Sequence, residues 1–104
     1  MNHHQILEQI RQVKRAVLPH GQLILFGSRA RGDARTDSDW DLLILIDRSL
    51  HTAEDFENYG YPFTELGWKL GCYFSAKVFT LQEWEQGKGS LFYKNVTHDG
   101  VEIA

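Results

Sequence analysis

Hydrophobic residues follow two different spacings in the first half of the chain. Between residues 3 and 18 they recur at helical intervals, which predicts an amphipathic helix with an apolar stripe formed by Ile6, Ile10, Val13 and Val17. Two uninterrupted apolar runs follow, at residues 22–26 and 42–46. Runs of this length are typical of strands that are buried on both faces of a sheet. The pattern therefore predicts a polar loop held between two buried strands.

The second half of the chain predicts shorter elements. A helix is expected over residues 53–70, with Pro62 causing a kink, a break or a new start near Tyr61. A third strand is expected over residues 74–80, followed by a short helix over residues 81–85 that Thr80 could cap. Residues 91–96 predict one or two helical turns, and residues 100–103 predict a last extended piece.

The predicted helix over residues 53–70 is rich in large side chains: Tyr59, Phe63, Leu66, Trp68 and Leu70. Most of them are expected to pack against the sheet. Some could instead form an exposed patch for a partner protein, because large apolar patches on small domains often mark interfaces.

Length and composition limit the classes of function. The 104 residues predict one domain, spanning residues 1–104, with one modest core. A formal net charge of -3 argues against a broad nucleic-acid surface. Cys72 is the single cysteine, which excludes an internal disulfide and favours a small core residue. With no signal peptide and no apolar run long enough to cross a membrane, we expect a cytoplasmic protein without membrane association.

The loop between the first two strands carries residues suited to phosphate binding. Gly27 permits a sharp turn and a close approach to a ligand, and Ser28 is expected to cap a short helix. The free N–H groups at a helix start favour a bound phosphate. Arg29, Arg31 and Arg35 add positive charge, and one or two of them are expected to face a ligand.

The same loop ends in two aspartates, Asp39 and Asp41. At the start of a strand, positions i and i+2 point to the same face, so the two carboxylates repel each other unless a cation lies between them. Mg²⁺ is the expected cation, since it takes carboxylate oxygens together with substrate phosphates. Each of these residues alone is more often a surface residue or a simple cap, but their ordered combination favours a site that binds a nucleoside triphosphate and its metal.

The order Gly27-Ser28, Arg31-Gly32 and Ser38-Asp39-Trp40-Asp41-Leu42 resembles the signature of the minimal nucleotidyltransferases. These belong to the DNA polymerase beta-like nucleotidyltransferase superfamily. The resemblance implies transfer of a nucleoside monophosphate, AMP from ATP, to an acceptor hydroxyl. It also implies one or two Mg²⁺ ions on Asp39 and Asp41, with the β- and γ-phosphates held by Gly27, Ser28 and the following N–H groups. Arg29 or Arg31 would neutralise the leaving pyrophosphate.

Together the elements and the resemblance predict an α/β (α+β) fold, in which a small mixed sheet carries helices mainly on one face. So short a chain has no room for an accessory domain that holds the acceptor. Many minimal nucleotidyltransferases pair instead with a small helical HEPN protein, as the antitoxin of a toxin–antitoxin pair. The resemblance therefore allows a HEPN-like partner here.

One residue departs from the family pattern. The family usually has a third catalytic carboxylate on a later strand, and alignment by context puts Lys77 in its place. No acid occurs anywhere between Gly71 and Leu81. Glu65, Asp47 or Glu57 could supply the missing acid from elsewhere. The alternative function is a catalytically degenerate member that binds a nucleotide or a partner without catalysis.

Overall fold

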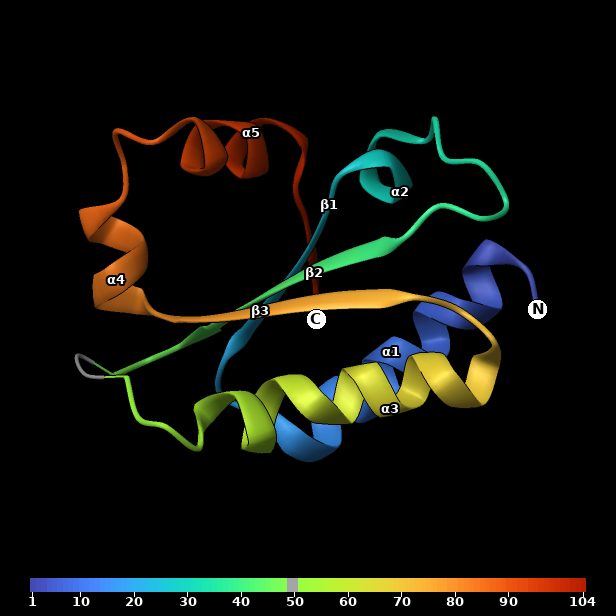
Figure 1. Cartoon of the computed structure of the whole chain (residues 1–104), viewed down its shortest axis with the longest axis horizontal. Coiled ribbons are helices and arrows are strands. Elements are labelled where there is room, and N and C mark those ends of the chain that lie inside the picture. The colour runs from blue at the N-terminus through green and yellow to red at the C-terminus, as the bar shows by residue number, and fades with distance from the viewer. Residues whose placement is uncertain (49–50) are drawn as a thin grey trace.

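The computed structural model describes residues 1–48 and 51–104, which form a four-stranded mixed sheet with helices on both faces (Figure 1). The elements in chain order are α1 (His3–Val17), β1 (Gln22–Phe26), α2 (Ser28–Arg31), β2 (Trp40–Ile46), the π-helical turn η1 (Phe56–Gly60), α3 (Tyr61–Leu70), β3 (Phe74–Thr80), α4 (Leu81–Gln86), α5 (Leu91–Asp99) and β4 (Val101–Ile103).

The sheet has the strand order β3-β2-β1-β4, which places β2 and β1 at the centre. β2 runs antiparallel to β1 and parallel to β3, and β4 pairs antiparallel with the other edge of β1. The predicted small mixed α+β sheet is confirmed. Its edge strands are β3 and β4, so β3 has one long side without a neighbouring strand among the described residues.

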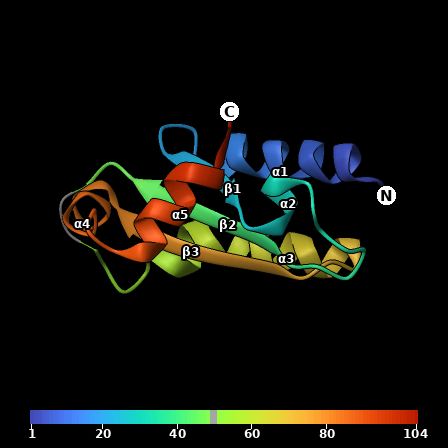
Figure 2. The same ribbon diagram turned by 90° about the horizontal axis from the view of Figure 1, so that it is seen from above.

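One face of the sheet is covered by α1 and α3, which lie side by side beneath it in Figures 1 and 2. Helix α1 buries Ile6 and Ile10, and α3 buries Phe63 and Leu66. These side chains form the larger hydrophobic core together with alternate residues of β2, namely Trp40, Leu42, Ile44 and Ile46. The two longest helices thus bury their apolar sides against one face, as the helical spacing in the sequence predicts.

The opposite face carries the two short helices α4 and α5, toward one end of the sheet (Figure 1). The other alternate residues of β2, Leu43 and Leu45, pack there against Val96 of α5. Aromatic rings complete this smaller cluster, with Phe92 in edge-to-face contact with Phe26 at a centroid distance of 5.5 Å. At the beginning of β2 the short helix α2 lies on this side instead (Figure 1), and Asp41 is half-buried there.

Most of the elements predicted from the sequence are present. Strands β1 and β3 have the predicted bounds, and β2 begins two residues before the predicted apolar run. Thr80 caps α4 in a capping box, in which its side chain accepts from the Glu83 amide at 3.1 Å. The predicted interruption at Pro62 takes the form of a π-helical turn directly before α3, and the chain passes from one into the other. The Tyr61 amide donates to the Phe56 carbonyl across that turn.

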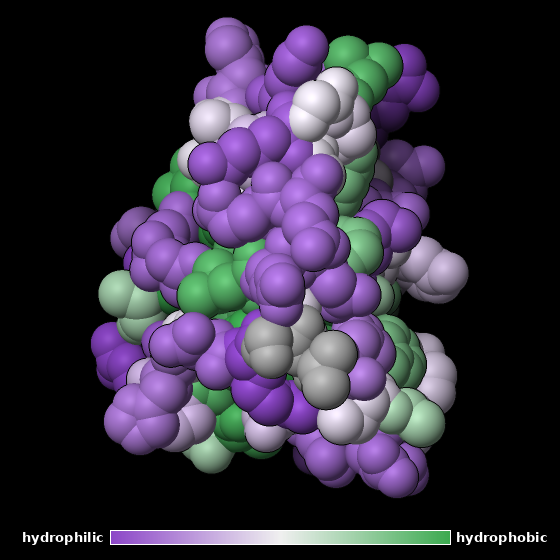
Figure 3. All heavy atoms as spheres, turned by 90° about the vertical axis from the view of Figure 1, so that its left-hand side faces the viewer, coloured by the Kyte–Doolittle hydropathy of each residue, from purple (hydrophilic) through white to green (hydrophobic). Residues whose placement is uncertain are grey.

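The expected packing of the aromatic residues of α3 holds for only some of them. Phe63 is fully buried, whereas Trp68 is 64% exposed. Tyr61, Phe56 and Tyr73 are also exposed and lie on α3, on η1 and directly before β3. The end of the molecule shown in Figure 3 is by contrast mainly hydrophilic, with hydrophobic side chains visible in small separate areas. The exposed aromatic residues therefore mark α3 and the neighbouring edge of β3 as the more apolar outer surface.

Within the described part of the chain, none of the helices has the length and apolar character that crossing a membrane requires.

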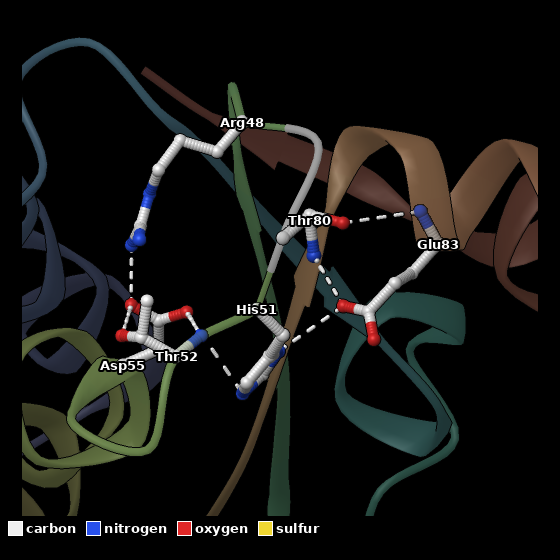
Figure 4. A network of polar contacts seen from close by, with 6 residues as sticks. All are labelled: Arg48, His51, Thr52, Asp55, Thr80 and Glu83. Atoms are coloured by element: carbon white, nitrogen blue, oxygen red, sulfur yellow. Dashed lines mark hydrogen bonds and ion pairs between the residues drawn. The ribbon is translucent and has the colours of Figure 1, made fainter.

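A buried carboxylate anchors the chain where it leaves β2 (Figure 4). Asp55 is 1% exposed and accepts hydrogen bonds from the Thr52 amide at 2.8 Å, from the Thr52 hydroxyl at 2.9 Å and from the Arg48 guanidinium. Burial alone would raise the pKa of Asp55, but these donors outweigh it and lower the pKa to about 2. The neighbouring His51 connects this group to Glu83 of α4, with its Nδ1 3.1 Å from Oε1.

Replacing Asp55 by asparagine is expected to lower the free energy of unfolding at neutral pH by about 2–4 kcal/mol, because the donors around this buried position lose their charged acceptor. The folded-state pKa lies below the ordinary value of 3.8, so the carboxylate stabilises the fold above about pH 4 and loses this effect as the pH falls toward 2. The stability difference between parent and Asp55→Asn in urea unfolding should therefore shrink over that range. The exposed Glu54→Gln is the control, and a difference that does not change with pH would contradict the account.

Candidate active site

The alternation of side chains along β2 fixes where the two aspartates point. Trp40 is fully buried in the core between the sheet and α1, while its neighbour Asp41 lies on the opposite face and is half-buried. Asp39 directly precedes the strand and is exposed. Since side chains two residues apart share a face, Asp39 and Asp41 are placed together on the face that α5 covers only in part.

Gly27 brings the turn after β1 into direct contact with Asp41. Its backbone has a φ of 75° and a ψ of -157°, a region that is accessible almost only to glycine. A Cβ atom on this residue would overlap the carboxylate oxygen Oδ2 of Asp41. Phe26, directly before it, pairs with Asp41 across the antiparallel strands. The glycine is therefore required both by the backbone conformation and by the carboxylate that the turn touches.

The short helix α2 begins at Ser28, as predicted, but the capping role predicted for Ser28 is wrong. Gly27 occupies the N-cap position, and there is no side-chain capping hydrogen bond. The intrahelical bonds start with the Ala30 amide, which donates to the Gly27 carbonyl at 3.1 Å. The amides of Ser28 and Arg29 precede this first bond and have no acceptor within the helix. Both amides and the Ser28 hydroxyl are thus free of the helix's own capping bonds.

Arg29 holds the loop that leads to the aspartates. Its Nη2 donates to the carbonyls of Ser38 and Thr36 at 2.9 and 3.2 Å, and its Nε donates to Ser38 at 3.3 Å. The guanidinium also lies 4.8 Å from the centroid of the Trp40 ring, in cation–π contact. These contacts fix the backbone directly before Asp39 to the helix that follows Gly27.

Arg31 points toward α5 instead. It forms ion pairs with Asp33 at 3.2 Å and with Asp99, near the other end of the chain, at 3.3 Å. The hydrogen bonds that its guanidinium donates to Asp33 and Asp99 raise the pKa of Arg31, which is charged at any physiological pH. Its side chain remains 44% exposed. Arg31 lines a pocket of about 300 Å³ together with Gly27, Phe26, Phe92, Asn95, Val96 and Asp99.

Four influences determine the protonation of Asp41. Burial raises its pKa, and the neighbouring Asp39 raises it further, while Lys77 and Arg31 act in the opposite direction. The net result is a pKa above the ordinary value of an aspartate. A cation placed between the two aspartates would remove their repulsion and favour both ionised forms.

Lys77 lies on β3, on the same face of the sheet as Asp41. It pairs with Leu43 across the parallel strands, and Leu43 follows Asp41 by two residues. Its ammonium is exposed and close enough to influence the pKa of Asp41. Directly opposite Asp41 in the register is Ser75, so β3 offers a hydroxyl and an ammonium to the site.

The other acids considered from the sequence do not complete the pair. Glu65 belongs to α3, which packs on the opposite face of the sheet, and Glu57 lies in the π-helical turn before it. Asp47 follows the far end of β2, six residues beyond Asp41. In the part of the chain that the structure describes, no three His, Cys, Asp or Glu side chains are grouped so that they could hold a metal ion. The interpretation that one of these acids replaces the third carboxylate is wrong.

The donor set still fits one hard divalent ion. Mg²⁺ is commonly bound by one or two carboxylates, with substrate phosphates and water filling the other positions. Asp39 and Asp41 supply that number. A pair of ions would need further oxygen ligands on the protein, and β3 supplies none that is charged. The side chains present therefore suit one metal that arrives with a phosphorylated substrate.

Comparison with known families identifies the chain. A model described as Polymerase beta, Nucleotidyltransferase matches residues 5–103. The chain belongs to this nucleotidyltransferase family. The family expected from the Gly27-Ser28 and Asp39-Trp40-Asp41 motif is confirmed, and the divalent metal that enzymes of this fold generally use agrees with the carboxylate pair. No curated protein matches the chain.

Solved structures share the fold at low identity. A toxin–antitoxin crystal structure with AMP-PNP superposes with a TM-score of 0.64 at 18% identity, over 94% of this chain and 72% of that one. A mutant of the toxin–antitoxin MntA-HpeT with two aspartate-to-glutamate changes gives a TM-score of 0.62 at 16% identity, over 100% of this chain and 73% of that one. At these identities the similarity establishes the fold of the chain and nothing further.

Two features of the site were not found from the sequence. The first is the burial of Trp40, which orients the two aspartates. The alternation of polar and apolar residues around it could have shown this burial. The link between Arg31 and Asp99 carries no signal, because 68 residues separate the two positions. The pairing of β4 with β1 and the packing of Val96 against β2 place the end of α5 beside α2.

Gly27→Ala is expected to lower the free energy of unfolding by about 3 kcal/mol, from backbone strain and from the overlap with Asp41. In an Asp41→Ala background the nearest atom of residue 41 would be its Cβ at 3.5 Å, an ordinary contact. The same substitution should therefore cost at least about 1 kcal/mol less there, measured as a double-mutant cycle by urea unfolding.

Gly32→Ala is the matched control for backbone strain. Gly32 also has a positive φ, of 84°, but a Cβ atom added there would meet no other atom within 4 Å. Gly32→Ala should lower the free energy of unfolding by the same amount with and without the Asp41 side chain. Equal costs of Gly27→Ala in the two backgrounds would show that the contact between the turn and the carboxylate is unimportant.

Proposed function

We propose that this nucleotidyltransferase transfers AMP from ATP to a hydroxyl group of an acceptor. The observation that carries the proposal is the contact of Gly27 with Asp41, which joins a phosphate-binding type of turn to a carboxylate pair. The family supports the reaction class, and the neighbour solved with AMP-PNP supports an adenine nucleotide.

In this proposal the two ends of the loop have separate tasks. The amides of Ser28 and Arg29, with the Ser28 hydroxyl, hold the β- and γ-phosphates beside Gly27. Asp39 and Asp41 hold Mg²⁺, which when bound neutralises part of the phosphate charge. The acceptor oxygen forms a bond to the α-phosphorus, the bond from that phosphorus to pyrophosphate breaks, and the hydroxyl proton leaves to solvent. Catalysis rests mainly on positioning and electrostatics.

The contacts of the two arginines favour different roles. Arg29 is engaged with the carbonyls of Thr36 and Ser38 and with the Trp40 ring, so we assign it to positioning the loop. Arg31 is partly exposed and lies beside Gly27 in the same pocket. We therefore assign the neutralisation of the leaving pyrophosphate to Arg31, whose partners Asp33 and Asp99 would yield to the more highly charged phosphates.

We propose further that a partner protein provides the acceptor, as the toxin of a toxin–antitoxin pair. Both neighbours described above are toxin–antitoxin structures. The exposed Trp68, Tyr61 and Tyr73 lie along α3 and beside β3, and such aromatic side chains are enriched at protein interfaces. A HEPN-like helical protein is the partner class that the resemblance to minimal nucleotidyltransferases implies.

A second candidate function is a degenerate nucleotidyltransferase that binds a nucleotide or a partner without catalysis. Lys77 is the observation in its favour, since it stands on the strand where the family's third carboxylate is expected. The intact turn at Gly27 and the pair Asp39 and Asp41 favour the enzyme. Incorporation of label from α-labelled ATP into a partner protein distinguishes the two.

Binding of Mg²⁺–ATP, measured by calorimetry, is expected for the parent and absent for the Asp39→Asn, Asp41→Asn double variant, because the metal loses both charged ligands. Asp37→Asn is the control, since Asp37 is an exposed acid of the same loop. Equal binding by the parent and the double variant would place the nucleotide elsewhere. Absence of binding to the parent would overturn the nucleotide site in the free chain.

Arg31→Gln is expected to weaken ATP binding about tenfold, which is the usual effect of losing one charge-assisted hydrogen bond. The exposed Arg35→Gln removes the same charge from the same loop and should change the Kd by less than about twofold, because exposed charges are screened. The same calorimetric titration measures both. If the two variants weaken binding equally, only the net charge of the loop matters.

A further inference from the structure

The strand β3 presents a cation to the two aspartates where a metal ligand is expected. Lys77 pairs with Leu43 of β2, and Leu43 shares its face with Asp41 two residues earlier. With neighbouring strands about 4.8 Å apart and about 3.3 Å of rise per residue, the Cα atoms of Lys77 and Asp41 are about 8 Å apart. An extended lysine side chain covers most of that distance.

The surroundings leave room for this ammonium to act on the site. Lys77 is exposed, although Leu43, its neighbour across the strands, is buried against Val96 of α5. None of the ion pairs among the described residues involves Lys77.

We propose that the Lys77 ammonium is a fixed cation that takes the place of a second metal ion, so that the site binds a single divalent ion together with the nucleotide. The proposal rests on the proposed nucleotide site. The carboxylates of Asp39 and Asp41 suffice for one divalent ion. The Lys77 ammonium on β3 repels a second divalent ion, whereas a carboxylate there would bind it. Lys77 supplies one positive charge to the reacting phosphate without needing a metal there.

The alternative explanation is that Lys77 protects the sheet. β3 is an edge strand, and natural edge strands often carry lysines that prevent pairing with another chain. On that account the site and Lys77 are unrelated, and replacing the lysine changes association and leaves metal binding unaltered.

The number of bound ions separates the two accounts. Mn²⁺ is titrated into an equimolar mixture of the protein and a non-hydrolysable ATP analogue. The electron paramagnetic resonance signal measures the concentration of free Mn²⁺. The parent is expected to bind one ion per chain. Lys77→Asp restores a third carboxylate and is expected to bind two, whereas Lys77→Gln removes only the charge and should bind one.

Lys69→Asp is the matched control, since it changes the net charge equally on α3, which packs on the opposite face, and should bind one ion. Circular dichroism establishes that the variants fold, and Lys77→Glu repeats the test with a longer acid. Two ions on the parent, or one on both folded acidic variants with the analogue bound, would overturn the proposal alone. If the parent does not bind the analogue, the proposed function fails first and the proposal falls with it.

Discussion

The site depends on the alternation of side chains along the central strand β2. This strand is buried on both faces along most of its length, so its register leaves no freedom: a shift by one residue would place Asp41 in the core, in the position that Trp40 or Leu42 now occupies. Trp40 sets the position at the end of the strand, because its ring is fully enclosed between the core and the guanidinium of Arg29. The hydrophobic effect that packs α1 and α3 under the sheet thus also holds Asp41 on the opposite, partly open face.

Polar contacts of the loop between β1 and β2 further fix the positions of the two aspartates. Arg29 is hydrogen bonded to the backbone directly ahead of Asp39, and Gly27 touches Asp41 from the other side. Both ends of the loop are therefore held by α2, a helix of four residues that has little stability of its own. A carboxylate pair held in this way is arranged before any ligand arrives, which is what electrostatic catalysis of phosphoryl transfer requires.

The strands and the motif could be predicted from the sequence because they rest on local patterns. Runs of apolar residues indicated β1 and β2, and the capping signal at Thr80 indicated the start of α4. Side-chain contacts over long separations could not be predicted, as the pairing of Arg31 with Asp99 illustrates. The direction in which an acidic side chain points could not be predicted either. Glu65 has the carboxylate that the site needs, but it belongs to α3, which packs on the opposite face of the sheet. The cap of α2 was misassigned to Ser28, since the positive φ of Gly27 is not visible in the sequence.

Family membership and the geometry of the loop lead to one central claim, that a nucleoside triphosphate binds between Gly27 and the pair Asp39 and Asp41. A crystal structure of the chain soaked with Mn²⁺ and a non-hydrolysable ATP analogue tests it most directly, because anomalous scattering locates the ion independently of the nucleotide. The account predicts an anomalous peak between the carboxylates of Asp39 and Asp41, with the triphosphate on the amides that follow Gly27. A triphosphate bound elsewhere on the chain, with no peak at these carboxylates, would contradict it.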